Sequence, residues 1–451
     1  MKRREFIRNT ALLAAAAEVP ALAAAAGHKP SAPAMPENTQ PAALGLIDTA
    51  PALMNYAETS MGITFGVSDM ANGYVIYGQK PDLSDGIKVL CGGYRVTRMH
   101  NKVMQVRLTG LKPATTYYYR IGADRISYLG GYKMKVLGNE EDPKTYSFTT
   151  AGKKAKSHFC VMNDTHASWK SFGPTVDKLV QLAPSCAIWN GDALNSDESM
   201  DFLKTVFLAP QIANRNYASA LPLLLAPGNH EDRGIETRTL ENIWMFRQPE
   251  ERSSRDWDLG RNFAVRMGDI ALIGLDTAED KLDTNPLLAG LFTSGPYREA
   301  QTAWLADALK QPQIASAPYL VAFCHIPLFD PNPKENPGDL FPADKHPDYS
   351  PDFASWQRTC ATMWSPLLNK AKCQLVITAH QHKYRYDAPD KNRRWAQIVG
   401  GGPDMNGKPG RFPTVVEGKV EDGALHVRVH NIYSGQVEAE HVFKPRKKSK
   451  A

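Results

Sequence analysis

The pattern of apolar and polar positions divides the chain into two parts. From about Gly45 to Gly152, short runs in which apolar and polar residues alternate are separated by turn residues. Alternation with a period of two is typical of half-buried strands. About seven such strands within roughly a hundred residues predict an antiparallel β-sandwich over residues 45–152. The clearest runs are Ile63–Val67, Tyr74–Tyr77, Val103–Leu108, Thr115–Ile121 and Tyr146–Thr150.

From about Lys153 the pattern changes, because strand-like apolar runs now alternate with amphipathic stretches. Apolar residues recur at helical spacing in two of these stretches, which predicts helices over Pro174–Leu182 and Glu299–Leu309. Alternating strands return from about Thr414 to Phe443. This order predicts an α/β domain over residues 153–443. Residues 330–353 hold many Pro, Asp and Asn without periodicity, which predicts a loop at the rim of a site.

Five apolar runs of the second domain end in side chains that could bind a metal. In sheets of this class, loops that follow the carboxyl ends of strands converge on one edge. We therefore expect these side chains to share one pocket. Each short motif also occurs as an ordinary turn or surface element, so their combined order carries the prediction. In chain order the side chains are Asp164 and His166, Asp192, Asn229 with His230 and Glu231, His325, and His380 with His382.

The mixture of donors predicts a site for two metal ions. Imidazole and carboxylate suit Zn, Mn, Fe or Ni, and no thiolate favours a structural zinc site. The set is too large for one tetrahedral ion but about right for two. Two neighbouring ions need a shared ligand, and Asp192 is the candidate because a carboxylate offers two oxygens.

This ordered series resembles the calcineurin-like metallophosphoesterase superfamily. The resemblance implies a sandwich of two β-sheets flanked by helices, preceded by the all-β sandwich. In the first domain, Leu111–Arg120 resembles the tyrosine corner of fibronectin type III-like domains, with Tyr117 as the corner residue. It is also similar to the N-terminal domain of purple acid phosphatase-like proteins. The likeness covers nearly the whole mature chain.

The resemblance also implies roles for the individual residues. One divalent ion would be bound by Asp164, His166 and His382, the other by Asn229, His325 and His380, and Asp192 would bridge them. The metals would be Fe, Zn or Mn. The catalytic residues would be His230, Asp192 and Asp164, with His230 stabilising the transferring group or protonating the leaving oxygen. The reaction would be in-line attack on phosphorus by a hydroxide held at the metals.

Three positions depart from the family pattern. Asn195 stands where purple acid phosphatases carry the tyrosine that binds ferric iron, so we expect no purple colour. Asn163 and Ala379 replace glycines that usually precede the first aspartate and the His-x-His motif. Asparagine tolerates glycine-like backbone angles better than alanine does, so Ala379 predicts a changed local geometry.

The substrate is expected to be a small-molecule phosphate ester, and the two-domain layout favours a phosphomonoesterase. A phosphodiesterase or nucleotidase is the alternative within the superfamily. From another class, the chain could be a non-catalytic binding protein on this scaffold, although no predicted ligand is missing. A metallo-β-lactamase is excluded because its His-x-His-x-Asp-His cluster is absent. Residues that could set the substrate preference are Trp169, Arg233, His346, Tyr384 and Arg385, each of which could equally serve in packing.

Composition and charge add the cellular context. The N-terminus, with Arg3 and Arg4 before an Ala/Leu run, predicts an export signal over residues 1–27, of twin-arginine or plain secretory type. Residues 28–44 are predicted to be a linker, and the protein periplasmic or secreted. Of the net charge of +6, residues 444–451 carry +5. The body is close to neutral, so no nucleic-acid partner is expected. The apolar run of the N-terminus is interrupted by Glu18 and Pro20 and is too short to span a bilayer, and no transmembrane segment is expected in the mature chain.

The six cysteines are expected to be mostly free thiols. Cys160, Cys186 and Cys324 each lie in a short apolar run, where cysteine behaves as a small buried hydrophobe. Cys360 and Cys373 could pair, and the sequence leaves that question open.

Overall fold

The computed structural model describes residues 45–91, 99–208, 217–246, 257, 259–281, 283, 290–291, 293–329, 362–405 and 409–446. The predicted export signal, the linker over residues 28–44, the loop over residues 330–353 with His346, and Cys360 lie outside the described residues. Within the described ranges, no helix combines the length and apolar character needed to cross a membrane.

The first part of the chain is all β, as predicted. All five of the runs named above form strands, and β6 extends seven residues beyond its predicted end at Ile121. The sheet with strand order β4-β3-β6-β7, in which β8 also pairs with β6, is antiparallel throughout. The strands are β1 (Ala52–Met54), β2 (Met61–Gly66), β3 (Ala71–Gly78), β4 (Ile87–Leu90), β5 (Val103–Leu108), β6 (Thr116–Tyr128), β7 (Met134–Glu141) and β8 (Tyr146–Thr149).

The second part alternates strands and helices. Its labelled helices are α1 (Trp169–Leu182), α2 (Met200–Phe207), α3 (Ser294–Ala308) and α4 (Pro312–Ala315), with short 3-10 turns at Tyr217–Ser219, Asn229–Asp232 and Thr237–Asn242. Residues 362–370 are helical as well. Its strands are β9 (His158–Met162), β10 (Cys186–Trp189), β11 (Leu223–Leu225), β12 (Phe263–Met267), β13 (Ile270–Leu275), β14 (Tyr319–Cys324), β15 (Leu375–Thr378), β16 (Arg385–Asp387), β17 (Ala396–Val399), β18 (Thr414–Glu421), β19 (Ala424–Asn431) and β20 (Val437–Phe443).

Both predicted helices are present, but each begins five residues earlier than the sequence indicated. The prediction placed Pro174 at the start of its helix, whereas α1 begins at Trp169 and contains the proline. Helix α3 begins at Ser294 and ends at Ala308. Element ends are the least certain feature of a sequence pattern, because they depend on capping contacts rather than on periodicity.

The two parts of the chain share a sheet. Strands β1, β2 and β5 continue a nine-stranded sheet whose order is β20-β19-β18-β9-β10-β11-β1-β2-β5. The junction is a parallel pairing of β1 with β11, in which Met54 lies opposite Leu223. The predicted domain boundary between residues 152 and 153 therefore separates strands that belong to one continuous sheet. The position of the domain boundary stays a prediction.

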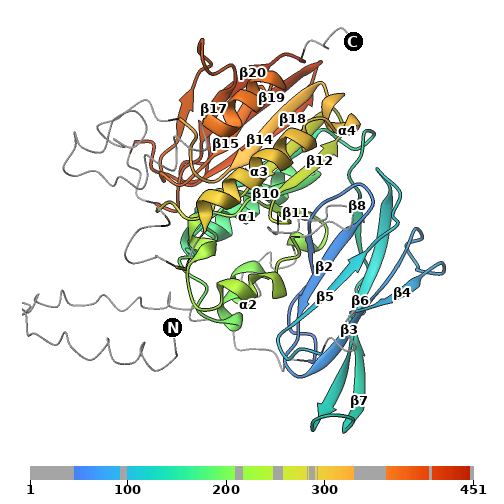
Figure 1. Ribbon diagram of the computed structural model, residues 1–451. Helices are drawn as coiled ribbons and strands as arrows, with labels where there is room; N and C mark the ends of the chain where they lie inside the picture. Colours follow the sequence, from blue (N-terminus) through green and yellow to red (C-terminus); the bar gives the residue numbers. More distant parts are fainter. Residues whose placement is uncertain are drawn as a thin grey trace, which may run out of the picture. The chain divides into compact units, whose positions relative to one another are not determined.

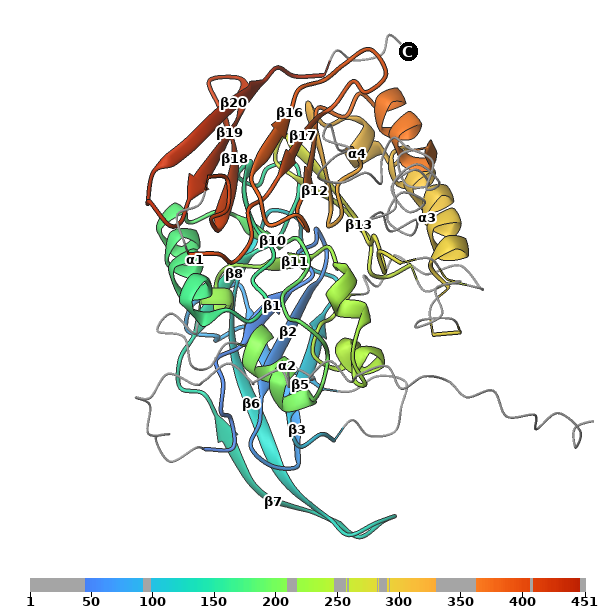
Figure 2. The same cartoon turned by 90° about the vertical axis from the view of Figure 1, so that its left-hand side faces the viewer.

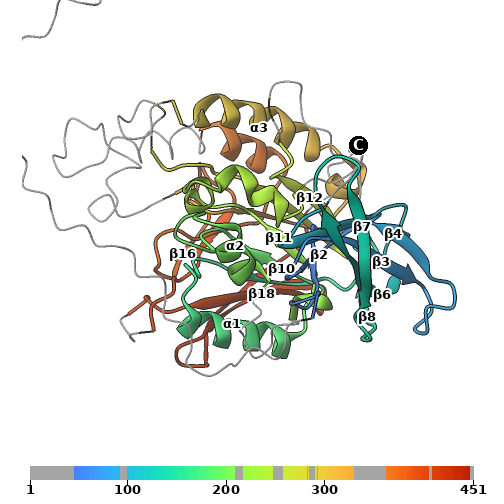
Figure 3. The same cartoon turned by 90° about the horizontal axis from the view of Figure 1, so that it is seen from below.

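The α/β part is a sandwich of two sheets between helices, the predicted fold class. The second sheet has the order β12-β13-β14-β15-β17-β16. Successive side chains of a strand point to opposite faces. Phe159 and Val161 accordingly pack with the second sheet, whereas Cys160 and Met162 pack with α1. The outer face of the second sheet packs with α3, and Figures 2 and 3 show α1 and α3 on opposite sides of the strands.

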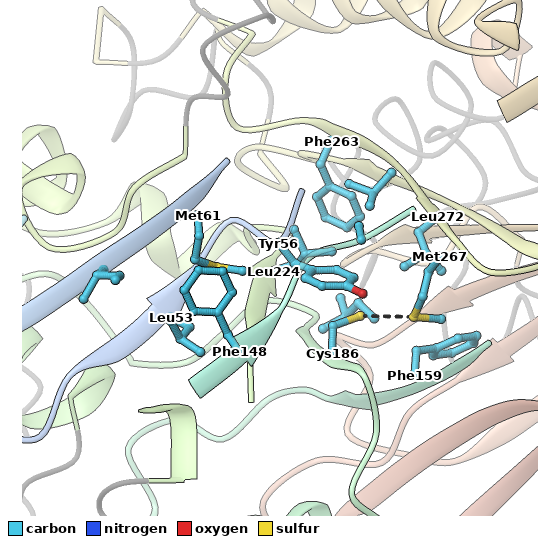
Figure 4. Packing of buried hydrophobic residues seen from close by; sticks show 14 of the residues in the cluster. Leu53, Tyr56, Met61, Phe148, Phe159, Cys186, Leu224, Phe263, Met267 and Leu272 are labelled. Carbon is cyan, nitrogen blue, oxygen red and sulfur yellow. Dashed lines mark hydrogen bonds between the residues drawn. The ribbon is translucent and has the colours of Figure 1, made fainter. Parts of the chain in front are cut away.

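One hydrophobic core extends from the first part of the chain into the sandwich. Leu53, Met61 and Phe148 belong to the same buried cluster as Phe263 and Leu272 (Figure 4). The N-terminal strands therefore stabilise the site-bearing sheet directly, through packing as well as through hydrogen bonds between strands.

Two smaller predictions are confirmed. The backbone N–H of Lys112 donates to the hydroxyl of Tyr117 at 2.9 Å, the hydrogen bond of a tyrosine corner. Cys160, Cys186 and Cys324 are buried free thiols. Cys373 is a buried free thiol as well, and Cys360 lies outside the described residues.

Candidate metal centre

The predicted ligands follow the carboxyl ends of five strands from the two facing sheets. Parallel pairing of β9, β10 and β11 aligns the loops that carry Asp164, Asp192 and Asn229. Parallel pairing of β14 with β15 aligns the loops that carry His325 and His380. Ligand atoms from the two sets of loops lie within 4.8 Å of one another, so both sets are at the same end of the sandwich.

Four of the predicted ligands form a first group. Donor atoms of Asp164, His166, Asp192 and His382 all lie within 4.8 Å of one another. His166 Nε2 is 2.9 Å from His382 Nε2 and 3.6 Å from Asp192 Oδ2. His382 Nε2 is 3.4 Å from Asp164 Oδ1.

A second group consists of Asp192, His325 and His380, whose donor atoms meet the same 4.8 Å limit. His325 Nε2 is 3.0 Å from Asp192 Oδ2. Asn229 joins this group, because its Oδ1 is 3.0 Å from His380 Nδ1. All seven predicted ligands are thus brought together, and Asp192 belongs to both groups, as a bridging carboxylate would.

The ligand loops have an unusual backbone. Asp164, His166, Asp192, His380 and His382 all have positive φ, between 44° and 68°. Each such residue costs of order 1 kcal/mol or more and persists only where its surroundings impose it. Asn163 and Ala379 have no positive φ; the left-handed residues are the ligands that follow them, Asp164 and His380. Whether the geometry at Ala379 differs from that of a glycine in the family stays a prediction.

Two glycines are required by the closeness of these loops. A Cβ at Gly228 would overlap Asp192 Oδ1, and a Cβ at Gly191, whose φ is +78°, would overlap His325 Nδ1. The glycines of the Gly-Asp and Gly-Asn-His motifs therefore let the loops from the two sheets approach within ligand distance.

Glu231 links two of the loops through their backbone. Its carboxylate is fully buried and accepts hydrogen bonds from the N–H groups of Gly228 at 2.6 Å, Asp192 at 2.9 Å and Ala193 at 2.8 Å. Burial and the neighbouring Asp192 charge raise the pKa of Glu231 to about 7, against the lowering effect of these donors. Glu231 is thus a structural partner of the backbone.

Three histidines have a defined orientation. The Nδ1 of His325 lies 2.8 Å from the carbonyl of Asn190, and that of His166 lies 2.9 Å from Asn195 Oδ1. The Nδ1 of His230 lies 2.6 Å from the backbone carbonyl of Asn195. Because these oxygens only accept, each Nδ1 carries a hydrogen and each Nε2 faces the centre of the site. Asn195 therefore orients two histidines, His166 through its side chain and His230 through its backbone.

The buried carboxylates of the cluster favour a positive charge beside them. Burial raises the pKa of Asp192, but the neighbouring histidines, His325 above all, outweigh burial and lower it. Burial lowers the pKa of His325, yet the Asp192 carboxylate raises it to about 10. Burial and the charge of His325 lower the pKa of His380 to about 3. Two buried aspartates thus attract a positive charge that a metal ion can supply in place of a proton.

The residues present fit a two-metal site. His325 Nε2 is buried and makes no hydrogen bond of good geometry although Asp192 Oδ2 lies 3.0 Å away, as expected of two ligand atoms that face the same ion. The donor set of imidazole, carboxylate and amide oxygen suits Zn, Mn or Fe.

Comparison with known families agrees with this geometry. Residues 157–384, half of the chain, match the calcineurin-like phosphoesterase family. The chain belongs to the calcineurin-like phosphoesterase family. Residues 51–150 match the N-terminal domain of purple acid phosphatases.

Solved structures show the same fold. The purple acid phosphatase PPD1 from yellow lupin (Lupinus luteus) seeds has a TM-score of 0.59 at 15% identity, over 88% of this chain and 75% of that chain. PhoD has a TM-score of 0.58 at 13% identity, over 90% of this chain and 93% of that chain. No curated protein matches the sequence.

Residues of this phosphoesterase that the sequence prediction missed lie after β13. Glu279 binds Arg233 through two hydrogen bonds of 2.9 Å, and Asp280 accepts a third at 3.0 Å. Arg233 Nη1 is 3.2 Å from His230 Nε2, and Asp280 Oδ2 is 3.8 Å from His380 Nε2. The signal was present, because Glu279 and Asp280 also follow an apolar run, Ile270–Leu275.

Of the described residues considered for substrate preference, two hydrogen-bond to the loops of the site: Arg233 to His230, and Arg385 to Gln381, which lies between His380 and His382. Trp169 packs on Phe172, with ring centroids 5.8 Å apart. Tyr384 packs on Phe412, with ring centroids 6.3 Å apart. Arg385 binds Asp387 at 3.0 Å, a contact on β16.

Proposed function

We propose that this chain is an exported, two-metal phosphomonoesterase. The observation that carries the proposal is that two groups of ligands at the ends of five strands have Asp192 in common. Two ions at such a site, when bound, neutralise phosphoryl oxygens and lower the pKa of water. Membership of the family supports phosphate esters as the substrate class.

Within this proposal, the first-group residues Asp164, His166 and His382 would hold one ion. The second-group residues Asn229, His325 and His380 would hold the other, and Asp192 would serve both groups. The second group holds one carboxylate, Asp192, and the neutral amide of Asn229. It therefore carries less negative charge than it would with an aspartate at position 229. An anionic phosphoryl group is then attracted rather than repelled.

His230 acts on the substrate rather than on the metals. Its Nε2 lies 3.8 Å from Asp192 Oδ2, at the inner edge of the cluster, while Nδ1 is bound by the carbonyl of Asn195. A group in this place can contact a phosphoryl oxygen and hold the proton for the leaving oxygen. Arg233 Nη1 lies 3.2 Å from the same Nε2. Because a guanidinium only donates, Nε2 accepts from Arg233 in this arrangement, and the ring gives up that contact when Nε2 holds a proton.

The preference for monoesters rests on the N-terminal domain. Residues 51–150 match the domain that precedes the catalytic domain in purple acid phosphatases, which makes phosphomonoesters the first class to test. The export part of the proposal rests on the arginine pair and the Ala/Leu run of residues 1–27.

The test is hydrolysis of p-nitrophenyl phosphate and bis-p-nitrophenyl phosphate by chelator-treated protein after addition of Mn²⁺, Zn²⁺ or Fe²⁺. Asp192→Asn removes the shared carboxylate charge, and Asp307→Asn, at an aspartate whose side chain is 81% exposed, is the matched control. We expect metal-dependent turnover that is faster on the monoester, abolished in Asp192→Asn and unchanged in Asp307→Asn.

Other outcomes separate the alternatives. Faster turnover of the diester would replace the monoesterase proposal with a phosphodiesterase. Metal binding without turnover of either ester would favour a binding protein on this scaffold. Turnover that survives chelation and the Asp192→Asn substitution would overturn the two-metal proposal.

A further inference from the structure

The hairpin formed by β6 and β7 ends in an exposed apolar tip, which we define as residues 127–137. Large apolar side chains here are open to solvent: Leu129 is 78% exposed, Val136 is 66% exposed, and Tyr132 is completely exposed at 106%. Tyr128, Met134 and Leu137 are also among the exposed large hydrophobic residues. Single exposed apolar residues are ordinary, but contiguous exposed patches mark binding surfaces.

The tip extends beyond the rest of its own sheet. The pairing of β3 with β6 ends at Arg125, whereas β7 pairs with β6 as far as Tyr128. Figures 1 and 2 show the hairpin running past the end of β3. Among the described residues, Ser127 and Tyr128 therefore have β7 as their strand partner.

The apolar side chains of the tip lie on one face and at its end. Tyr128 lies opposite Met134 on one face, where Val136 follows. The pair on the other face, Ser127 and Lys135, is polar, and Leu137 lies at a register shift between β6 and β7. Leu129 and Tyr132 form the end of the hairpin. A protein partner that adds a strand would pair with the backbone along the edge of β7, whereas a lipid surface covers the apolar end.

The charge of the tip is wholly positive. Residues 127–137 contain Lys133 and Lys135 and no acidic residue. Lysine near an apolar surface buries its aliphatic stem and keeps its ammonium group at the polar boundary. Tyrosine has the same preference for the boundary between water and lipid. The combination complements the anionic headgroups of a lipid surface.

Three backbone hydrogen bonds close the turn. Leu129 N–H donates to the carbonyl of Lys133 at 2.9 Å, Lys133 N–H to that of Gly130 at 2.9 Å, and Met134 N–H to that of Tyr132 at 3.0 Å. Inserting unpaired backbone groups into lipid is costly, so a closed turn is the part of a hairpin that can enter.

We propose that this tip inserts into the interfacial region of an anionic lipid membrane and anchors the phosphoesterase at its surface. Three residues of strand on each side of the turn span about 10 Å. That length equals the depth of roughly 5–10 Å to which interfacial segments are buried. Insertion is limited to the tip, because the outer edge of β7 has no strand partner among the described residues.

The test is co-sedimentation of the full chain with vesicles of phosphatidylglycerol and phosphatidylcholine, and with vesicles of phosphatidylcholine alone. Leu129→Ser combined with Tyr132→Ser removes the apolar end. The matched control is Leu90→Ser on β4 at the opposite edge of the same sheet, because Leu90 is 57% exposed. The N-terminal segment is common to all variants, so differences between them report on the hairpin.

We expect the double substitution to weaken binding to the anionic vesicles at least tenfold and Leu90→Ser to leave it unchanged. Each of Lys133→Gln and Lys135→Gln should weaken it about fivefold, an effect that salt reduces. In a Tyr132→Trp variant, tryptophan emission should shift to the blue when anionic vesicles are added. Hydrolysis of a soluble ester should be unchanged in every variant, because none lies at the metal centre.

The proposal is overturned if anionic vesicles leave the tryptophan emission of the Tyr132→Trp variant unchanged, or if the double variant binds them as tightly as the original chain. Self-association is the other explanation for an exposed apolar tip. Sedimentation velocity without lipid tests it: a dimer that the Leu129→Ser, Tyr132→Ser substitution dissociates, together with no vesicle binding, would make a second copy the occupant and overturn the lipid proposal.

Discussion

The link between the β10 and β11 loops depends on Glu231, and Glu231→Gln tests it. The carboxylate accepts three backbone N–H groups, two through Oε2 and one, from Ala193, through Oε1. Glutamine keeps one acceptor oxygen for the first two donors but turns an NH₂ group toward Ala193. At pH 8, above the Glu231 pKa of about 7, one hydrogen bond to a charged acceptor is lost and a buried donor is left unpaired, which together cost about 3 kcal/mol.

The measurement is the free energy of unfolding in guanidinium chloride, with chelator present so that metal binding does not contribute. The matched control is Glu241→Gln, at an exposed glutamate, which should change stability by less than about 0.5 kcal/mol. We also expect weaker metal binding by Glu231→Gln, because the backbone on both sides of Asp192 is no longer fixed. Equal stability of Glu231→Gln and Glu241→Gln would refute this role.

Three further substitutions test other parts of the structure. Glu417 accepts hydrogen bonds from His158 and His430 at 2.9 and 3.0 Å, which lower its pKa from 4.5. Its stabilisation is therefore present above about pH 4.5 and lost below it, so Glu417→Gln should cost about 2 kcal/mol at pH 7 and progressively less in acid, measured by denaturant unfolding across pH. Tyr117→Phe removes the corner hydrogen bond and should cost about 1 kcal/mol in the same assay; no change would contradict the corner role. Asn195→Ala frees one histidine ring and should weaken metal binding roughly tenfold by calorimetric titration, whereas unchanged affinity would contradict the orienting role.

The sequence predicted the features that depend on a local pattern, namely the apolar runs that form buried strands and the polar side chains that follow each run. The runs before Asp164, Asp192 and His325 are apolar throughout because both faces of each strand are buried, one against the other sheet and one against helices. Parallel strands then bring their ends together by geometry alone. That is why ligands from distant parts of the chain could be assigned to one site.

The features that the sequence did not predict depend on contacts between distant segments. Strand β1 is a three-residue apolar run, too short to carry a period, and its pairing with β11 joins the two parts of the chain. Asn195 attracted notice for the tyrosine it replaces, but its hydrogen bonds to two histidines follow from folding of the loop. The start of α1 at Trp169 was missed because Pro174 is typical of a first helical turn.

The most direct test of the two-metal centre is the number of metal ions bound per chain, measured by mass spectrometry after chelation, reloading with Mn²⁺ or Zn²⁺ and gel filtration. The account predicts two ions in the original chain, two in Asp307→Asn, and at most one in Asp192→Asn, because the aspartate shared by the two groups is lost. One ion or none in the original chain, or two ions in Asp192→Asn, would contradict the shared-ligand centre on which the proposed function rests.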